Sequence, residues 1–128
     1  AQFIGENNKL TGTIKKVAKD NCQVQLDDGT MLVADPVNVS GEGGRTTVSL
    51  RPERIEIDPD KSVENNVQGK IEELIYLGDH IRVRMNVAGN DEFIVKVRNR
   101  RDKRPISEGD TVAVGWAASD CKALDAVA

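Results

Sequence analysis

The sequence contains few of the side chains that bind bases, metals or reactive groups. Its 128 residues include two Phe, one Trp, one Tyr, two Cys and one His. Cys22 and Cys121 lack C-x-x-C spacing, and with His80 alone they cannot complete a tetrahedral metal set. No secretory feature favours a disulfide, so we expect two buried or inert thiols in a reducing compartment. The sequence therefore predicts no metal site and no cofactor site in this chain.

Long apolar runs and an excess of positive charge are also missing. No apolar stretch approaches the ~20 residues needed to cross a bilayer, and no signal-peptide pattern opens the chain. The formal net charge is −3 and the pI is about 5.2, so no long-range field attracts nucleic acid. Domains that hold single strands stack bases on aromatic side chains, whereas alternation directs Phe93 and Trp116 toward the core. Nucleic-acid binding therefore ranks last among the functions considered.

No catalytic or nucleotide-binding motif stands out. The glycine-rich stretch 38–44 has neither the lysine nor the spacing of a P-loop. His80 is the only histidine available to activate a nucleophile, and we predict a solvent-facing turn position for it. The adjacent carboxylates 27–28 and 72–73 are interpreted as solvated turn and edge charges, because neighbours on a strand face opposite sides. The sequence thus predicts no catalytic residues and no enzyme activity for this chain.

Alternation of apolar and polar residues dominates what is present. In the segment 80–87, every second residue is apolar and the intervening positions include Arg82 and Arg84, which is typical of a strand with one solvated face. The turn 88–91 leads back into 93–98 as the partner strand. Because no 3.6-residue apolar stripe persists for three turns, we predict an all-β protein.

A short segment occurs twice. Residues 10–14 recur as 67–71, with an offset of 57 residues (67 − 10). Each copy then passes through alternating segments to a glycine-led strand, and matching these strands places Val48 near Val112. Two copies are too few for a solenoid, and about five short strands per copy suit a small OB-like barrel. The other matched positions are Asn8 with Asn65, Gly12 with Gly69, and Gly44 with Gly109.

These features predict tandem OB-like small β-barrels, two repeats that share a core. The polar, proline-containing segment 58–64 is the expected connector. It separates a first repeat at 8–57 from a second repeat at 65–128. An exchange of terminal strands between the barrels would blur this boundary.

Two polar segments are candidates for binding. The first is a basic run at 96–104. One hypothesis is that it forms an anion-contacting loop for RNA, lipid headgroups or an acidic protein face; the favoured alternative is a solvated hairpin connection. In the segment 51–53, a structural clamp between copies or chains is favoured over a ligand site, because proline belongs at a strand end. The residues are Lys96, Arg98, Arg100, Arg101, Lys103 and Arg104 in the basic run, and Arg51, Pro52 and Glu53 in the other segment.

Four segments together resemble a known family. Residues 3–8 look like the junction after the nucleotide-binding domain of importer-type ABC transporter ATPases, and 48–53 look like the "hRPE" strand of their C-terminal regulatory part. Residues 78–79 and 109–116 look like the closing TOBE repeat of that region. The match covers essentially the whole chain in the right order. It is closest to the polyamine (spermidine/putrescine) and iron(III) group.

The resemblance implies a non-catalytic regulatory and dimerisation domain of an importer ATPase subunit. Residues 1–7 would be a linker remnant, and ATP and Mg would bind the missing nucleotide-binding domain. The implied partners are that domain, a second ATPase subunit and the transmembrane permease subunits, at the cytoplasmic side of the inner or plasma membrane. The alternative is a TOBE module that binds a small ligand or an oxyanion such as molybdate, and the third is an OB-fold nucleic-acid-binding module.

Overall fold

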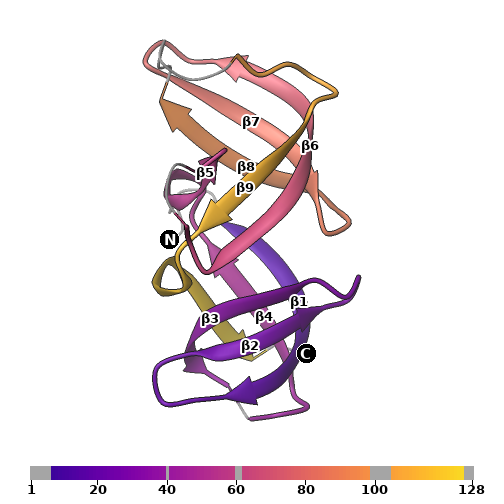
Figure 1. Cartoon of the computed structure of the whole chain (residues 1–128), viewed down its shortest axis with the longest axis vertical. Helices are drawn as coiled ribbons and strands as arrows, with labels where there is room; N and C mark the ends of the chain where they lie inside the picture. Colours follow the sequence, from indigo (N-terminus) through magenta and orange to yellow (C-terminus); the bar gives the residue numbers. More distant parts are fainter. Residues whose placement is uncertain (1–6, 40, 60–61, 99–104, 126–128) are drawn as a thin grey trace, which may run out of the picture.

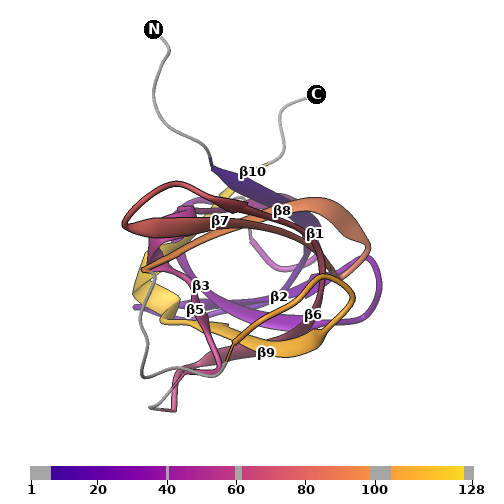
Figure 2. The same ribbon diagram turned by 90° about the horizontal axis from the view of Figure 1, so that it is seen from above.

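The chain folds into two β units that lie end to end. The computed structural model describes residues 7–39, 41–59, 62–98 and 105–125. Within these ranges every regular element is a strand or a single 3-10 turn, and no helix is long and apolar enough to span a membrane. The all-β prediction is therefore confirmed. Figure 1 shows one unit above the other, and Figure 2 shows their strands arranged around a common centre.

The first unit is a closed five-stranded barrel. Its strands follow the order β1-β2-β3-β10-β4, and the C-terminal strand β10 closes it between β3 and β4. All pairings are antiparallel except the parallel pairing of β10 with β3. The strands are β1 (Asn8–Val17), β2 (Cys22–Leu26), β3 (Met31–Asn38), β4 (Arg45–Leu50) and β10 (Cys121–Asp125).

The second unit repeats this order in an open form. Its sheet follows the order β5-β9-β6-β7-β8, so β5 occupies beside β9 the place that β10 occupies beside β4. After β5 the backbone takes a left-handed conformation at Asp58 (φ +49°), and Pro59 follows without an N–H to donate. The strands are β5 (Glu56–Ile57), β6 (Asn65–Tyr76), β7 (His80–Val87), β8 (Asn90–Arg98) and β9 (Thr111–Trp116).

The two units exchange their fifth strands. The 3-10 turn η1 (Pro52–Arg54) leads from β4 to β5 in the second sheet, and η2 (Ala118–Asp120) leads from β9 to β10 in the first barrel. In Figure 1 the yellow C-terminal strand accordingly lies in the lower unit. The sequence-derived boundary assigned β10 to the second repeat and β5 to the first. Each strand instead completes the other unit's sheet, because its edge hydrogen bonds are formed there.

The internal repeat is visible in the hydrogen bonds. Both first strands have a bulge at the same place, after Ile14 in β1 and after Ile71 in β6, which are 57 residues apart. The Ile14 carbonyl accepts from Gly43 N–H at 2.7 Å, and the Ile71 carbonyl accepts from Gly109 N–H at 2.7 Å. The matching of equivalent residues in the first strands of the two copies is therefore confirmed.

The predicted match between the fourth strands was wrong by two residues. Val48 lies opposite Leu10, and the position equivalent to Leu10 faces Val114 rather than Val112. The equivalent of Gly109 is Gly43, the first of two adjacent glycines. Counting from Gly44 instead of Gly43 accounts for one of these two residues.

A single core runs through both units. Its buried side chains come from β1 to β4 and β10 in the first barrel and from β6 to β9 in the second. Phe93 and Trp116 pack with their ring centroids 6.0 Å apart, and both are buried as predicted. Gly12 lies where a Cβ would stand 2.5 Å from the carbonyl oxygen of Gln25, so this position permits no side chain without movement of the backbone.

Candidate functional site

The predicted clamp lies on the first crossover turn. Arg51 is the extended N-cap residue of η1, Pro52 occupies the start of the turn and is buried, and Glu53 follows at the surface. The side chains of Arg51 and Glu53 are 59% and 54% exposed, and Arg51 Nη1 lies 3.9 Å from Glu53 Oε2. Such an exposed pair contributes little to folding, so both charges remain accessible to a partner. Whether these residues form an interface stays a prediction.

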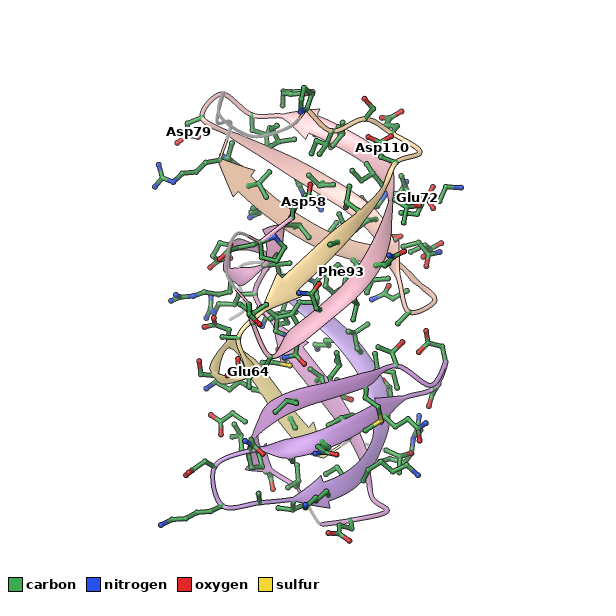
Figure 3. All side chains as sticks on the ribbon, in the orientation of Figure 1. Asp58, Glu64, Glu72, Asp79, Phe93 and Asp110 are labelled. Atoms are coloured by element: carbon green, nitrogen blue, oxygen red, sulfur yellow. The ribbon has the colours of Figure 1, made fainter. Side chains whose placement is uncertain are left out.

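The second crossover turn lies beside the first. Arg54 Nε is 4.0 Å from Asp120 Oδ1, which connects η1 to η2. Glu64 Oε1 accepts a hydrogen bond from the Ala118 N–H at 3.0 Å, and this bond holds the pKa of Glu64 below its usual range. Figure 3 places Glu64 at the level of the joint between the units. We call Arg51, Glu53, Arg54 and Asp120 the crossover patch.

Two buried asparagines join the units reciprocally. Asn8 of β1 bonds the backbone of Ile94 in β8, with the Ile94 N–H donating to Oδ1 at 2.8 Å and Nδ2 donating to the Ile94 carbonyl at 2.7 Å. Asn65 of β6 makes the same two bonds to Val33 in β3, at 2.7 and 2.8 Å. Each asparagine amide therefore bonds both the backbone N–H and the backbone carbonyl of one residue on a strand of the other unit. The sequence had matched these two asparagines without assigning them a role.

The basic run falls mostly outside the described residues. Of its residues Lys96 and Arg98 are described, both on β8; Lys96 is half-buried, and Arg98 is exposed at the end of the strand opposite His80. Arg100, Arg101, Lys103 and Arg104 lie outside the described ranges. His80 begins β7 and its side chain is 35% exposed, so it is half-buried in a strand rather than in a solvent-facing turn. Its Nδ1 lies 2.9 Å from Asp79 Oδ1, and this hydrogen bond lowers the pKa of Asp79.

The paired carboxylates have structural partners. Asp27 accepts two hydrogen bonds from Arg45, at 2.7 and 3.1 Å, and these lower the pKa of Asp27. Asp28 accepts from the Thr30 N–H at 2.9 Å and so closes the hairpin turn. Glu73 Oε1 lies 3.5 Å from Arg84 Nε. The turn interpretation of Asp27 and Asp28 therefore agrees with the structure, whereas Glu72 and Glu73 are exposed on β6, an inner strand of the second sheet rather than an edge.

The two thiols are free and buried. Cys22 on β2 and Cys121 on β10 flank Ala34 of β3, because Cys22 pairs with Ala34 and Lys122 pairs with Asp35. Burial raises the pKa of Cys121 to about 12 and also raises that of Cys22. Neither thiol is therefore ionised near neutral pH. Among the described residues no group of three metal-ligating side chains forms.

A small groove opens between the units near the β7–β8 turn. Its volume is about 160 Å³. Ala88 in this turn has a positive φ of 53°, an uncommon conformation for a residue with a Cβ. Asn90 Nδ2 donates to the Lys9 carbonyl across the groove at 3.4 Å. The lining residues are Lys9, Leu10, Thr11, Leu26, Asp27, Ala88, Gly89 and Asn90.

Comparison with known proteins matches the chain to one domain family and to import ATP-binding proteins. Residues 48–124 match the family model of the TOBE domain. The spermidine/putrescine import ATP-binding protein PotA of Trichodesmium erythraeum is 28% identical over 97% of this chain and 34% of its own length. The maltose/maltodextrin import ATP-binding protein MalK of Vibrio cholerae is 30% identical over 94% of this chain and 32% of its own length.

A solved structure has the same fold. The cytoplasmic molybdate-binding protein ModG aligns with a TM-score of 0.78 and 15% identity, covering 93% of this chain and 96% of its own. The tandem OB-like arrangement predicted from the sequence is thereby confirmed. The chain spans about a third of the length of the curated relatives it matches. Because the family model matches more than half of the residues, the chain belongs to the TOBE domain family.

Proposed function

We propose that this chain is the non-catalytic regulatory and dimerisation domain of an ABC importer ATP-binding subunit, with polyamine as the favoured solute. The observation that carries the proposal is the match of nearly the whole chain to one third of import ATP-binding proteins, most of them named for spermidine and putrescine. ATP and Mg would then bind the rest of the subunit. The subunit would lie at the cytoplasmic side of the membrane, against transmembrane permease subunits.

The surface at the joint supports pairing with a second copy. The crossover patch presents charges of both signs, which suits an isologous contact in which the same patch meets itself. Pro52 is buried beneath the patch, so the backbone carrying Arg51 and Glu53 is anchored. A partner's Glu53 would face Arg51 across such a two-fold axis.

Sedimentation of the full-length subunit tests this pairing. We expect Arg51→Glu to raise the dimer dissociation constant about tenfold, because a charge in the contact then meets a like charge. Lys19→Glu is the matched control, since it makes the same charge change on an exposed residue between β1 and β2. An unchanged dimer in the Arg51→Glu variant would count against the proposed interface.

The non-catalytic role has its own test. Calorimetry with the isolated chain should detect no ATP binding at micromolar concentrations, because nothing in its sequence resembles a phosphate-cradling loop. Saturable ATP binding would overturn the assignment of ATP to the rest of the subunit.

The second candidate function is binding of a small ligand in the groove between the units. The observation that favours it is the convergence of Lys9, Asp27 and Asn90 with the strained Ala88 at one concave place. Calorimetric titration with molybdate and with spermidine separates the two candidates. Saturable molybdate binding that Lys9→Gln abolishes, or saturable spermidine binding that Asp27→Asn abolishes, would favour the ligand-binding function over a purely structural groove.

A further inference from the structure

Each unit is completed by a fifth strand from the other half of the sequence repeat. The strand β10 lies between β3 and β4 in the first barrel. The strand β5 lies beside β9 in the second sheet and faces β8 across the seam where that sheet is open. Figure 1 shows β5 in the upper unit and β10 in the lower unit. The alternation of apolar and polar residues leaves open which unit each fifth strand joins.

The third strands, β3 and β8, carry opposite charges at equivalent positions. Val33 and Ile94 are equivalent, because each makes the same two backbone bonds to an asparagine of the other unit. Two residues further along, Asp35 of β3 is therefore equivalent to Lys96 of β8. Both side chains point outward, because the residue before each of them is fully buried in the core.

The fifth strands, β5 and β10, carry the opposite inversion. Lys122 of β10 pairs with Ser49, and Glu56 of β5 pairs with Gly115. Ser49 and Gly115 are equivalent, because their partners on the first strands, at positions 9 and 66, are separated by the repeat offset. Lys122 and Glu56 therefore occupy equivalent places, and both are exposed.

These charges are complementary within each unit as it is folded. In the first barrel Lys122 Nζ lies 2.8 Å from Asp35 Oδ2. In the second unit Glu56 occupies the place beside β8 that Lys122 occupies beside β3. Without the exchange, β10 would bring Lys122 beside Lys96, and β5 would bring Glu56 beside Asp35. Opposite charges on neighbouring strands stabilise a sheet, and like charges destabilise it.

We propose that these inverted charges select which unit each fifth strand joins, with Asp35 and Lys96 as the residues that discriminate between β10 and β5. Specificity of this kind combines an attraction in the correct pairing with a repulsion in the wrong one. Each fifth strand meets an opposite charge in the exchanged fold and would meet a like charge in the unexchanged fold. We call Asp35 with Lys122, and Lys96 with Glu56, the exchange pairs.

Reversing the charges of both fifth strands in the full chain tests the proposal. Glu56→Lys combined with Lys122→Glu keeps the net charge at −3 but makes both exchange pairs like-charged. We expect the equilibrium constant for unfolding in urea, followed by Trp116 fluorescence, to rise about tenfold at low salt, because each exposed pair changes from attraction to repulsion. In about 1 M sodium chloride the rise should shrink to about threefold or less, because salt screens exposed charges.

The matched control reverses two charges on the first strands. Lys15→Glu combined with Glu72→Lys also keeps the net charge, and both residues are exposed, on β1 and β6. Because neither residue lies between a third and a fifth strand, the equilibrium constant for unfolding should change by no more than about twofold. A chain with reversed fifth strands that is as stable as this control would overturn the proposal.

A rescue experiment in the first barrel separates pairing from local damage. Lys122→Glu alone should raise the equilibrium constant for unfolding about threefold to fivefold, and adding Asp35→Lys should return it to within about twofold of the original chain. The rescue is made in the first barrel because Lys96 also faces Arg82 across the β7–β8 hairpin. If Asp35→Lys fails to rescue Lys122→Glu, chain connectivity and core packing place the fifth strands, and the exchange pairs do not. Neither result bears on the proposed dimerisation.

Discussion

The two buried asparagines allow the connection between the units to be tested quantitatively. Asn8 is 3% exposed, and its amide bonds both the N–H and the carbonyl of Ile94. In Asn8→Ala these two backbone groups lose their partners while remaining in the joint. Each unsatisfied buried group costs about 1–3 kcal/mol, so for two groups we expect a loss of about 2–6 kcal/mol in the free energy of unfolding. Asn65→Ala should cost less, toward the lower end of this range, because its two bonds to the half-buried Val33 are only partly buried.

Urea unfolding followed by Trp116 fluorescence measures this loss, since Trp116 is the only tryptophan and is buried in the shared core. The matched control is Asn66→Ala, an exposed neighbour of Asn65, for which we expect a change within about 0.5 kcal/mol. Asn8→Asp is the sharper variant, because it keeps the acceptor for the Ile94 N–H but turns an oxygen toward the Ile94 carbonyl. If Asn8→Ala and Asn65→Ala both have the same free energy of unfolding as Asn66→Ala, the reciprocal bonds do not stabilise the joint.

Three further outcomes follow from the described contacts. Gly12→Ala should destabilise the chain by about 1–3 kcal/mol in urea unfolding, because its Cβ would overlap a backbone carbonyl. Cys22 and Cys121 should react with a thiol reagent at pH 8 only on the timescale of unfolding, because both are buried and have raised pKa values. The Asp27 carboxyl should titrate below its ordinary pKa of 3.8 and return toward it in Arg45→Gln. Any stabilisation from the Asp27–Arg45 pair is then present above the ordinary pKa of 3.8 and is lost as the pH falls through the lowered pKa of Asp27.

Alternation predicted the strands but not the sheet that each strand joins. In β10 the residues Cys121 and Ala123 are buried and Lys122 is exposed, a pattern that would fit the edge of either unit. The 3-10 turn η2 carries the chain from β9 in the second sheet to β10 in the first barrel. Period-two patterning indicates which face of a strand is buried and carries no information about its neighbours. The alternation of apolar and polar residues therefore could not predict which unit β5 and β10 join.

The joint was missed for a related reason. The repeat matched Asn8 with Asn65, but their partners are the backbone groups of Ile94 and Val33, and backbone groups leave no mark in a sequence. The same limit explains the shifted fourth strand, because Gly43 and Gly44 are equivalent as letters. The structure distinguishes them, because Gly43 shares with Gly109 a positive φ and the hydrogen bond to the isoleucine carbonyl of the first strand. The exposed charges at 51–53 were easier to find, since proline at a strand end and flanking ions are visible in the sequence itself.

The exchanged strands connect the two units mechanically. Separating the units would pull β10 from between β3 and β4, detach β5 from β9, and break four asparagine–backbone bonds within one continuous core. These losses would occur together, because each connection spans the same joint. We therefore expect the two units to move as one body, so that a contact at either unit displaces the crossover patch along with it. A partner bound to the hairpin β7–β8 would thus displace η1 without any hinge between the units.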